Sequence, residues 1–204
     1  MNPLARAPLI LASGSPYRRE LLTRLALPFS VASADIDESP LDAEAPEKTA
    51  LRLAAAKAHA VAAHHESAVV IGSDQVAAYD GKHFGKPGDH ANALAQLRML
   101  RGRVAHFHTA LCVIGRSKSG EKMVQTDIAT TVVRFRELAD HELDAYLRTE
   151  KPYDCAGSAK AEGLGIALLE RIDSDDPTAL IGLPLIRLVS MLRALGYPLL
   201  SSST

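Results

Sequence analysis

Two cysteines and the lack of any long apolar run exclude several protein classes for this chain. Cys112 and Cys155 are too few for a disulfide framework and neither belongs to a CxxC pair, so we expect a reducing compartment. No apolar stretch approaches the ~20 residues that a membrane-spanning helix needs, and the apolar run near the N-terminus is too short for a signal peptide. We therefore predict a soluble, cytoplasmic protein without a membrane partner.

An excess of charge of one sign is also missing. The 23 Lys and Arg residues nearly balance the 24 Asp and Glu residues, which leaves a formal net charge of -1. A chain without a basic excess has no general electrostatic attraction to nucleic acid, so we expect no stable nucleic-acid partner. Any phosphorylated ligand must instead be bound by a local cluster of cations.

Several common catalytic and binding patterns are absent as well. No segment has the glycine and lysine spacing of a P-loop, and no Ser-His-Asp or Cys-His set has a local motif that would raise it above chance. His106 and His108 share one face of a predicted strand, but two histidines without a third ligand are a weak zinc signal. The chain also has no internal repeat, low-complexity segment or linker.

What is present is the order of an α/β domain. At 204 residues and 47% apolar composition the chain can bury a substantial core, so we predict a single domain over residues 1–204. Hydrophobic patterns predict strands at 8–12, 29–32, 68–72, 104–116, 123–136 and 165–171, and helices at 16–27, 46–65, 90–100, 140–149 and 185–195. The first strands alternate with helices and the two long strands form an antiparallel pair, so the predicted sheet is mixed.

The turn at 13–15 joins the first predicted strand to a helix and is typical of a phosphate site. Its serines and glycine offer hydroxyls and backbone N–H groups, and Ser15 can cap the helix. Helix N-termini attract anions, and Arg18 and Arg19 add two forked cations in the first turn. The alternative is an ordinary strand-to-helix turn with solvated arginines, which these residues alone do not exclude.

Carboxylates follow two of the predicted strands. Asp35, Asp37 and Glu38 form a short acidic loop after the second strand, and Asp74 ends the third. Carboxylates from two strand ends can hold a divalent cation, which prefers oxygen ligands. We predict Glu38 and Asp74 as this pair, since a carboxylate that closes a strand as apolar as 68–72 needs a partner. We interpret Asp35 and Asp37 as a solvated turn.

Three lysines are candidates for phosphate binding. Lys57 lies on the apolar stripe of its predicted helix, where it either snorkels to solvent or reaches inward to a phosphate. Lys86 and Lys160 each lie in a loop whose small neighbours allow the close approach of an anion. Taken alone, each of these two is more typical of a surface lysine.

Six motifs follow one another along nearly the whole chain. They are LASGSPYRRELL at 11–22, DIDE at 35–38, Lys57 in its helix, GSDQV at 72–76, GKP at 85–87 and GLP at 182–184. This set, in this order, resembles the Maf family of nucleoside triphosphate pyrophosphatases. Tyr17 and the segment CAGSAKAEGLGI at 155–166 are similar to the branch that hydrolyses 7-methyl-GTP. The dTTP/UTP branch usually has a third arginine in place of Tyr17 and a different, Gly-rich segment with Gln near Glu162.

The resemblance implies a fold, a reaction and a set of roles. The fold is α/β and Maf/inosine-triphosphatase-like, an elongated mixed β-sheet flanked by helices, with two lobes around a central cleft and often a homodimer. The reaction is hydrolysis between the α and β phosphates, with Mg²⁺ or Mn²⁺ as the divalent metal cation. Asp74, Glu38, Lys57 and Lys86 are the implied catalytic residues, with Glu38 and Asp74 as metal ligands and Asp74 as general base. The implied substrate-binding residues are Ser13, Ser15, Tyr17, Arg18, Arg19, Gln75, Lys160 and Glu162.

The chemistry of two residues fits a methylated guanine. Methylation at N7 makes guanine cationic and leaves N1–H and the exocyclic amine as donors. Glu162 can accept from both donors, and the ring of Tyr17 can stack on the cation, which is worth ~0.5 to 2 kcal/mol. The alternative is that Glu162 belongs to a solvated loop and Tyr17 to a helix packing face.

Two other functions stay open at this point. The first is a sister enzyme of the same family that acts on dTTP, UTP or CTP, against which Tyr17 and Glu162 argue. The second is a non-enzymatic, nucleotide-binding regulator of cell division, which leaves the convergent acidic and basic residues unexplained.

Overall fold

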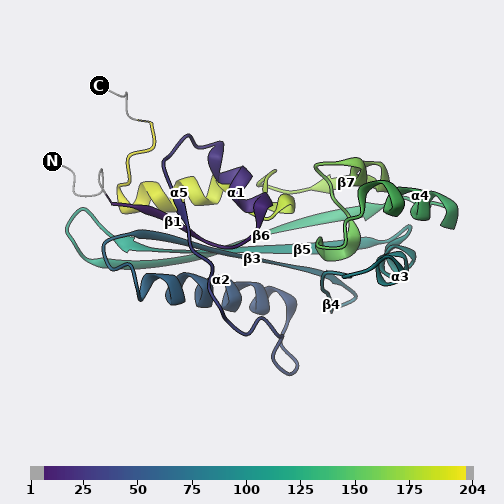
Figure 1. The fold of residues 1–204 in the computed structure, drawn as a ribbon, viewed down its shortest axis with the longest axis horizontal. Coiled ribbons are helices and arrows are strands. Elements are labelled where there is room, and N and C mark those ends of the chain that lie inside the picture. The colour runs from purple at the N-terminus through teal and green to yellow at the C-terminus, as the bar shows by residue number, and fades with distance from the viewer. Residues whose placement is uncertain (1–6, 201–204) are drawn as a thin grey trace.

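The computed structural model describes residues 7–200 and centres on a seven-stranded sheet (Figure 1). The strands are β1 (Leu9–Ala12), β2 (Ser30–Val31), β3 (Val69–Tyr79), β4 (Lys82–Phe84), β5 (Val104–Arg116), β6 (Lys122–Phe135) and β7 (Leu169–Asp173). Their order is β2-β1-β3-β5-β6-β7, with β4 pairing with part of β3. β1 runs parallel to β2 and β3, while the remaining pairs are antiparallel. The predicted mixed sheet is confirmed.

Helices cover both faces of this sheet. They are α1 (Pro16–Thr23), α2 (Pro46–Ala62), α3 (His90–Leu100), α4 (Asp140–Glu150) and α5 (Leu185–Leu195), with the 3₁₀ segments η2 (Ala156–Ser158), η3 (Leu164–Leu168) and η4 (Ala179–Ile181). α1 and α5 lie on one face and α2 on the other, while α3 and α4 lie at the far end of the long strands (Figure 1). The elongated sheet flanked by helices agrees with the fold class predicted from the sequence.

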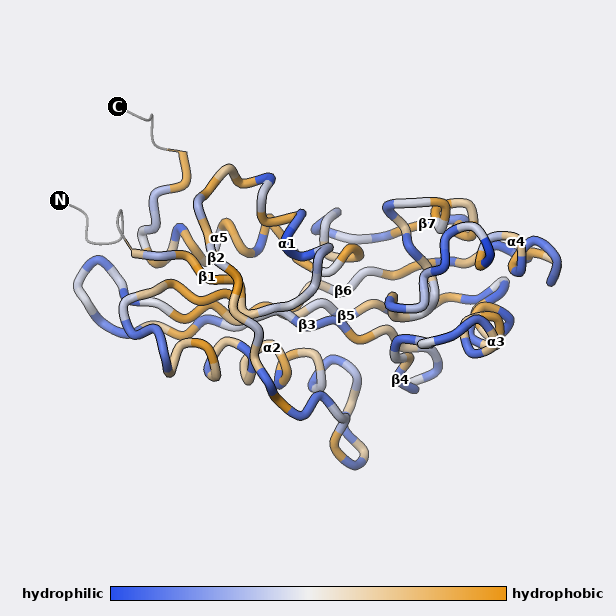
Figure 2. The backbone as a smooth tube through the Cα atoms, in the orientation of Figure 1, coloured by the Kyte–Doolittle hydropathy of each residue, from blue (hydrophilic) through white to orange (hydrophobic). Residues whose placement is uncertain are grey.

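The hydrophobic core is divided into three clusters. Leucines of α1 and α5 pack on one face of β1, β3 and β5, and alanines of α2 pack on the opposite face. A third cluster joins α3 and α4 to the distal halves of β5 and β6. Apolar residues accordingly follow the central strands and the inner helix faces, while polar residues gather in the outer turns (Figure 2). The first two clusters lie on opposite faces of the same strands and form one packed region, and the third cluster forms a second region farther along the sheet. The site lies between these two regions.

The structure corrects three of the predicted elements. β3 does not end at Gly72 but continues to Tyr79, because β5 pairs with it without interruption from Val70 to Ala78. Residues 79–89, for which the sequence predicted no strand, contain the short strand β4. The predicted strand 165–171 is wrong at its start, since residues Leu164–Leu168 form a 3₁₀ helix and β7 begins at Leu169. The pattern of apolar residues within one strand does not show where its pairing ends, because the hydrogen bonds are formed with a partner strand that lies elsewhere in the sequence.

Two further findings concern the chain as a whole. The predicted domain 1–204 includes residues 1–6 and 201–204, which lie outside the described residues. No helix between residues 7 and 200 is both long enough and apolar enough to cross a membrane.

Candidate active site

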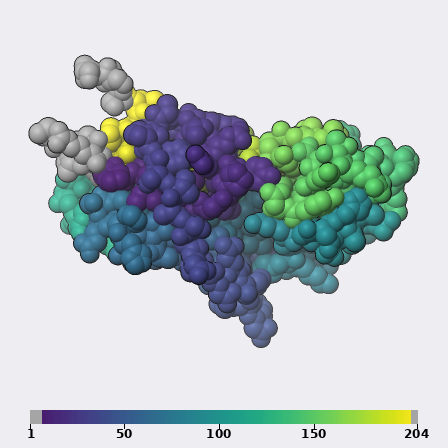
Figure 3. Space-filling model, viewed as in Figure 1, coloured from purple at the N-terminus to yellow at the C-terminus, as the bar shows by residue number. Residues whose placement is uncertain are grey.

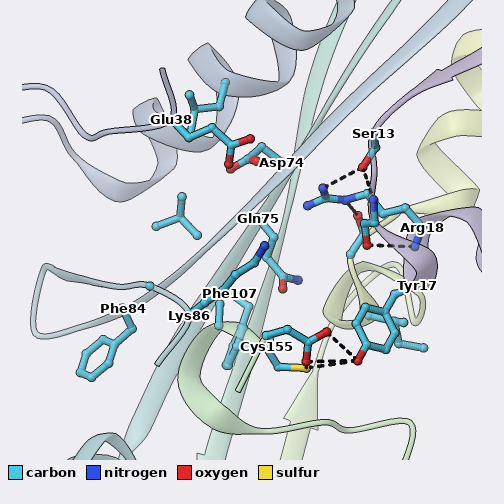
Figure 4. A pocket seen from close by; sticks show the side chains of 18 of the residues that line it. Ser13, Tyr17, Arg18, Glu38, Asp74, Gln75, Phe84, Lys86, Phe107 and Cys155 are labelled. Carbon is cyan, nitrogen blue, oxygen red and sulfur yellow. Dashed lines mark hydrogen bonds between the residues drawn. The ribbon is translucent and has the colours of Figure 1, made fainter. Parts of the chain in front are cut away.

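A cavity of about 550 Å³ lies between the two packed regions. Its wall combines the turn before α1, the loop before α2, the middle of β3, the segment after β4 and the loop that contains η2. In the space-filling view the purple N-terminal segments and the green segment near residue 150 occupy adjoining parts of the surface (Figure 3). Residues far apart in the sequence therefore converge on one chamber, as Figure 4 shows.

The turn before α1 holds Arg18 at the cavity wall. Ser15 is the N-cap and its hydroxyl accepts from the Arg18 backbone N–H at 3.4 Å, with Pro16 in the first turn as the pattern predicted. The Arg18 guanidinium donates to the Ser13 hydroxyl at 3.3 Å and to the Gly182 carbonyl at 2.8 Å. Burial lowers the Arg18 pKa, and the charges of Asp74 and Glu38 oppose that change. A fixed cation therefore faces two carboxylates across the cavity.

Arg19 does not share this placement. Its side chain is exposed and is absent from the cavity wall, because successive residues of a helix project about 100° apart. Of the two arginines in the predicted phosphate site, the structure brings only Arg18 to the cavity.

Lys57 joins the two predicted metal-binding carboxylates. Its ammonium donates to Asp74 Oδ1 at 2.6 Å and lies 2.8 Å from Glu38 Oε1. Lys57 and Asp74 are each only 6% exposed, whereas Glu38 is exposed. Lys57 thus points inward and does not snorkel to solvent, and its charge is satisfied by the carboxylates. Its contact with a phosphate stays a prediction.

Close packing of α2 on β3 explains why Lys57 reaches Asp74. Ala54 and Ala58 of α2 press against Gly72, where an added Cβ would collide with the Ala54 carbonyl oxygen. Gly72 and Asp74 share one face of β3 because side chains alternate along a strand. The lysine between the two alanines is therefore held against the carboxylate two residues beyond the glycine.

The loop that carries Glu38 is anchored by a network that the sequence did not indicate. Arg52 of α2 donates to both carboxylate oxygens of Glu44 at 2.8 Å and to the Ser39 carbonyl at 2.9 Å. The Thr49 hydroxyl contacts Glu44 at 2.9 Å and the His83 ring at 2.9 Å. Arg52 lowers the pKa of the Glu44 carboxyl to about 2. These contacts tie the acidic loop, α2 and β4 together beside the cavity.

The other two predicted phosphate lysines differ in position. Lys86 lines the cavity, is exposed, and forms no ion pair within residues 7–200. Lys160 is absent from the cavity wall and its ammonium pairs with Glu150 at 2.9 Å. Lys86 is thus available to an anion, while Lys160 is already neutralised by a neighbouring carboxylate.

Tyr17 and Glu162 also line the cavity, and Tyr17 lies at the end away from Glu38 and Asp74 (Figure 4). The Tyr17 hydroxyl donates to Asp154 at 3.2 Å and lies 3.7 Å from the Cys155 sulfur. Reduced solvation raises the Glu162 pKa, and its carboxylate forms no ion pair within the described part of the chain. This end of the cavity therefore has an aromatic ring and acceptor groups, as a donor-bearing base requires.

Gln75 lines the cavity but its amide nitrogen is engaged in holding the structure. It donates to the Thr109 hydroxyl at 2.9 Å and to the carbonyls of Ala179 and Leu180, each at 3.0 Å. Ser73 donates to the same Gly182 carbonyl that Arg18 uses, at 3.0 Å. Gln75 thus supports η4, and its role in substrate binding stays a prediction.

Glu38 and Asp74 are the predicted ligands of a divalent metal. Within the described residues no group of three or more His, Cys, Asp or Glu side chains converges. The Glu38 and Asp74 carboxylates nevertheless point toward each other (Figure 4), and both contact the Lys57 ammonium. Mg²⁺ is commonly held by one or two carboxylates together with substrate phosphates and water, so this pair fits such an ion.

Comparison with known proteins gives consistent matches. Residues 8–195 match the family model described as "Maf-like protein". A Cupriavidus metallidurans protein named 7-methyl-GTP pyrophosphatase is 62% identical over 198 residues, covering 97% of this chain and 98% of that protein. A Paraburkholderia xenovorans protein of the same name is 64% identical over 205 residues, covering 98% of each. The solved Staphylococcus aureus Ham1 protein is 16% identical with a TM-score of 0.44, covering 64% of this chain and 72% of that chain.

Proposed function

Because the chain belongs to the Maf-like protein family, we propose that it hydrolyses 7-methyl-GTP to 7-methyl-GMP and pyrophosphate. Relatives with that activity in their names are 62% and 64% identical over nearly the full chain. The observation that carries the proposal is the lining of the cavity. Arg18 and Lys86 line it as candidate phosphate ligands, and Tyr17 and Glu162, which we call its base end, line it as candidate base ligands. One chamber thus offers cations for a triphosphate and acceptors for a guanine edge.

The carboxylates and the candidate phosphate ligands that line the cavity support a hydrolytic mechanism. Asp74 takes a proton from the attacking water, which then adds to the anhydride while the bond between the α and β phosphates breaks. Lys57 engages only Oδ1 of Asp74, so Oδ2 makes no hydrogen bond within residues 7–200. Arg18 and Lys86 stabilise the negative charge that develops on the departing pyrophosphate.

A divalent cation is part of the proposal. Mg²⁺ or Mn²⁺, held by Glu38 and Asp74, would neutralise phosphate charge and lower the pKa of bound water. The fit of the two carboxylates supports this assignment. We further propose that the protein is cytoplasmic and forms a homodimer. The two unpaired cysteines, Cys112 and Cys155, agree with the reducing compartment that a cytoplasmic location implies.

A nucleotide panel tests the proposed function. Pyrophosphate release would be measured as kcat/KM for 7-methyl-GTP, GTP, UTP, dTTP and CTP. We expect the highest value for 7-methyl-GTP. A preference for UTP or dTTP would make the pyrimidine-acting sister enzyme the better interpretation, and no release from any nucleotide would favour a binding regulator.

Loss of a phosphate contact should affect every nucleotide alike. Lys86→Ala and Arg18→Ala each remove a charge-assisted hydrogen bond worth ~1.5 to 3 kcal/mol, so kcat/KM should fall by about 10- to 100-fold on all accepted substrates. Phosphates carry no base identity, which is why the substrate ranking should be unchanged. Lys82→Ala is the matched control, because Lys82 is exposed in the same hairpin and is absent from the cavity wall. A changed base preference in Lys86→Ala would contradict the assignment of Lys86 to phosphate binding.

Loss of a base contact should instead change the ranking. Tyr17→Ala removes stacking worth ~1 to 3 kcal/mol, and Glu162→Gln places a donor opposite a guanine donor at a cost of ~1 to 3 kcal/mol. We expect kcat/KM for 7-methyl-GTP to fall about 5- to 100-fold more than that for UTP. Glu170→Gln, on an exposed residue away from the cavity, is the control. Equal losses on all substrates would show that neither residue reads the base.

A further inference from the structure

Asp154 is a carboxylate at the base end of the cavity that the sequence analysis did not single out. It lines the cavity beside Tyr17 and is exposed. Its two oxygens lie 3.4 and 3.2 Å from the Tyr17 hydroxyl, which donates to them. Asp154 forms no ion pair among residues 7–200, so its charge is uncompensated.

We propose that Asp154 selects a cationic base over a neutral base of the same hydrogen-bonding pattern, an inference that rests on the proposed function. 7-Methylguanine and guanine present the same N1–H and exocyclic amine donors. Glu162, which accepts from that edge, cannot tell the two apart. They differ in the methyl group and in the positive charge, so discrimination on charge requires a negative group near the ring that stacks on the base.

The groups around Tyr17 leave this end of the cavity negative. The Lys160 ammonium lies 5.9 Å from the centroid of the Tyr17 ring, but Glu150 pairs with it at 2.9 Å. Asp154 and Glu162 remain as two carboxylates that form no ion pair among the described residues, although the Lys160 charge opposes the rise in the Glu162 pKa. A positively charged base entering beside Tyr17 would be attracted by the charge of these carboxylates, whereas a neutral base gains only the hydrogen bonds that Glu162 accepts.

The hydrogen bond to Asp154 also prepares the ring of Tyr17. Burial, together with Cys155 and Asp154, raises the Tyr17 pKa. The hydroxyl therefore keeps its proton and donates a hydrogen bond to Asp154. A phenol that donates to a carboxylate has a more electron-rich ring, which strengthens a cation–π contact. Asp154 therefore acts on a cation by its own charge and through the Tyr17 ring.

The test measures kcat/KM for 7-methyl-GTP, GTP and UTP in wild type and Asp154→Asn. Assays below neutral pH keep the N1 proton on the methylated ring and with it the positive charge. We expect the ratio of 7-methyl-GTP to GTP to fall by about five- to tenfold, the scale of one partly exposed charge interaction. The ratio of GTP to UTP should be unchanged, because the amide still fills the same space.

Three further variants separate charge from shape. Asp154→Glu should recover part of the selectivity, and Tyr17→Phe should lose part of it, since the ring remains but its hydrogen bond is lost. Asp173→Asn removes an equal charge from β7, where Asp173 pairs with Arg171 away from the cavity, and should leave both ratios unchanged.

The outcomes distinguish this inference from the proposed function. A wild-type protein that does not release pyrophosphate from 7-methyl-GTP would overturn the proposed function and the inference together. A wild-type protein that hydrolyses 7-methyl-GTP but does not prefer it over GTP would overturn the inference alone. The same holds if Asp154→Asn keeps the wild-type ratio, or loses all three activities equally with no change in either ratio.

Discussion

Asp74→Asn is expected to reduce kcat for pyrophosphate release by ~10² to 10⁴-fold, the usual cost of losing a general base. The amide cannot take a proton from water at neutral pH and is a weaker metal ligand than a carboxylate. Asn has nearly the same size as Asp, and Lys57 keeps Glu38 as a counter-charge at 2.8 Å. The folded structure should therefore persist, and the loss should appear in turnover on every substrate.

Two measurements accompany this substitution. Thermal unfolding of the variant checks that the loss does not come from unfolding. Asp42→Asn is the matched control, because Asp42 is exposed in the same loop as Glu38 and is absent from the cavity wall. Turnover of Asp74→Asn near the wild-type rate would reduce Asp74 to a structural partner of Lys57.

Removal of divalent metal is expected to lower activity by ~10³-fold or more, since charge stabilisation by a bound cation contributes several kcal/mol. The substrate carries about four negative charges, and two of the nearby cations are partly compensated. Lys57 is paired with Glu38 and Asp74, and Lys160 with Glu150. Arg18 and Lys86 alone leave much of the phosphate charge unbalanced.

The measurement is pyrophosphate release in excess EDTA, followed by titration with Mg²⁺ or Mn²⁺. Activity should return on addition of either ion, and EDTA already saturated with Mg²⁺ serves as the control for the chelator itself. Full activity in excess EDTA would reject Glu38 and Asp74 as metal ligands. In that case Lys57, Arg18 and Lys86 would have to stabilise the phosphates without help.

Lys57 and the proposed divalent cation would use the same pair of carboxylates. A divalent cation held by Glu38 and Asp74 would share their carboxylates with the Lys57 ammonium. Lys57 is buried on the α2 face and cannot move far into solvent, so it would stay close to any phosphate bound there. The lysine thus holds the two carboxylates together and supplies a cation at the same point.

Local patterns in the sequence determined the elements that depend on near neighbours. α3 and α5 have the predicted bounds 90–100 and 185–195, and β5 has the predicted bounds 104–116. The Ser15 cap followed from residues within one helical turn. The ordered motifs also predicted the family, which the match over residues 8–195 confirms. Such features need only the chemistry of a residue and its spacing from others close in the chain.

Only the tertiary structure decided which of the candidate residues meet. Arg18 faces the cavity and Arg19 does not, because the packing of α1 on the sheet sets its rotation. Asp74 lies in the middle of β3, since β5 continues the pairing past the polar residues. Tyr17 meets Asp154 across 137 positions of sequence, a contact that neither segment encodes alone. Contacts of this kind depend on strand order and helix packing, which are properties of the whole chain and have no local pattern.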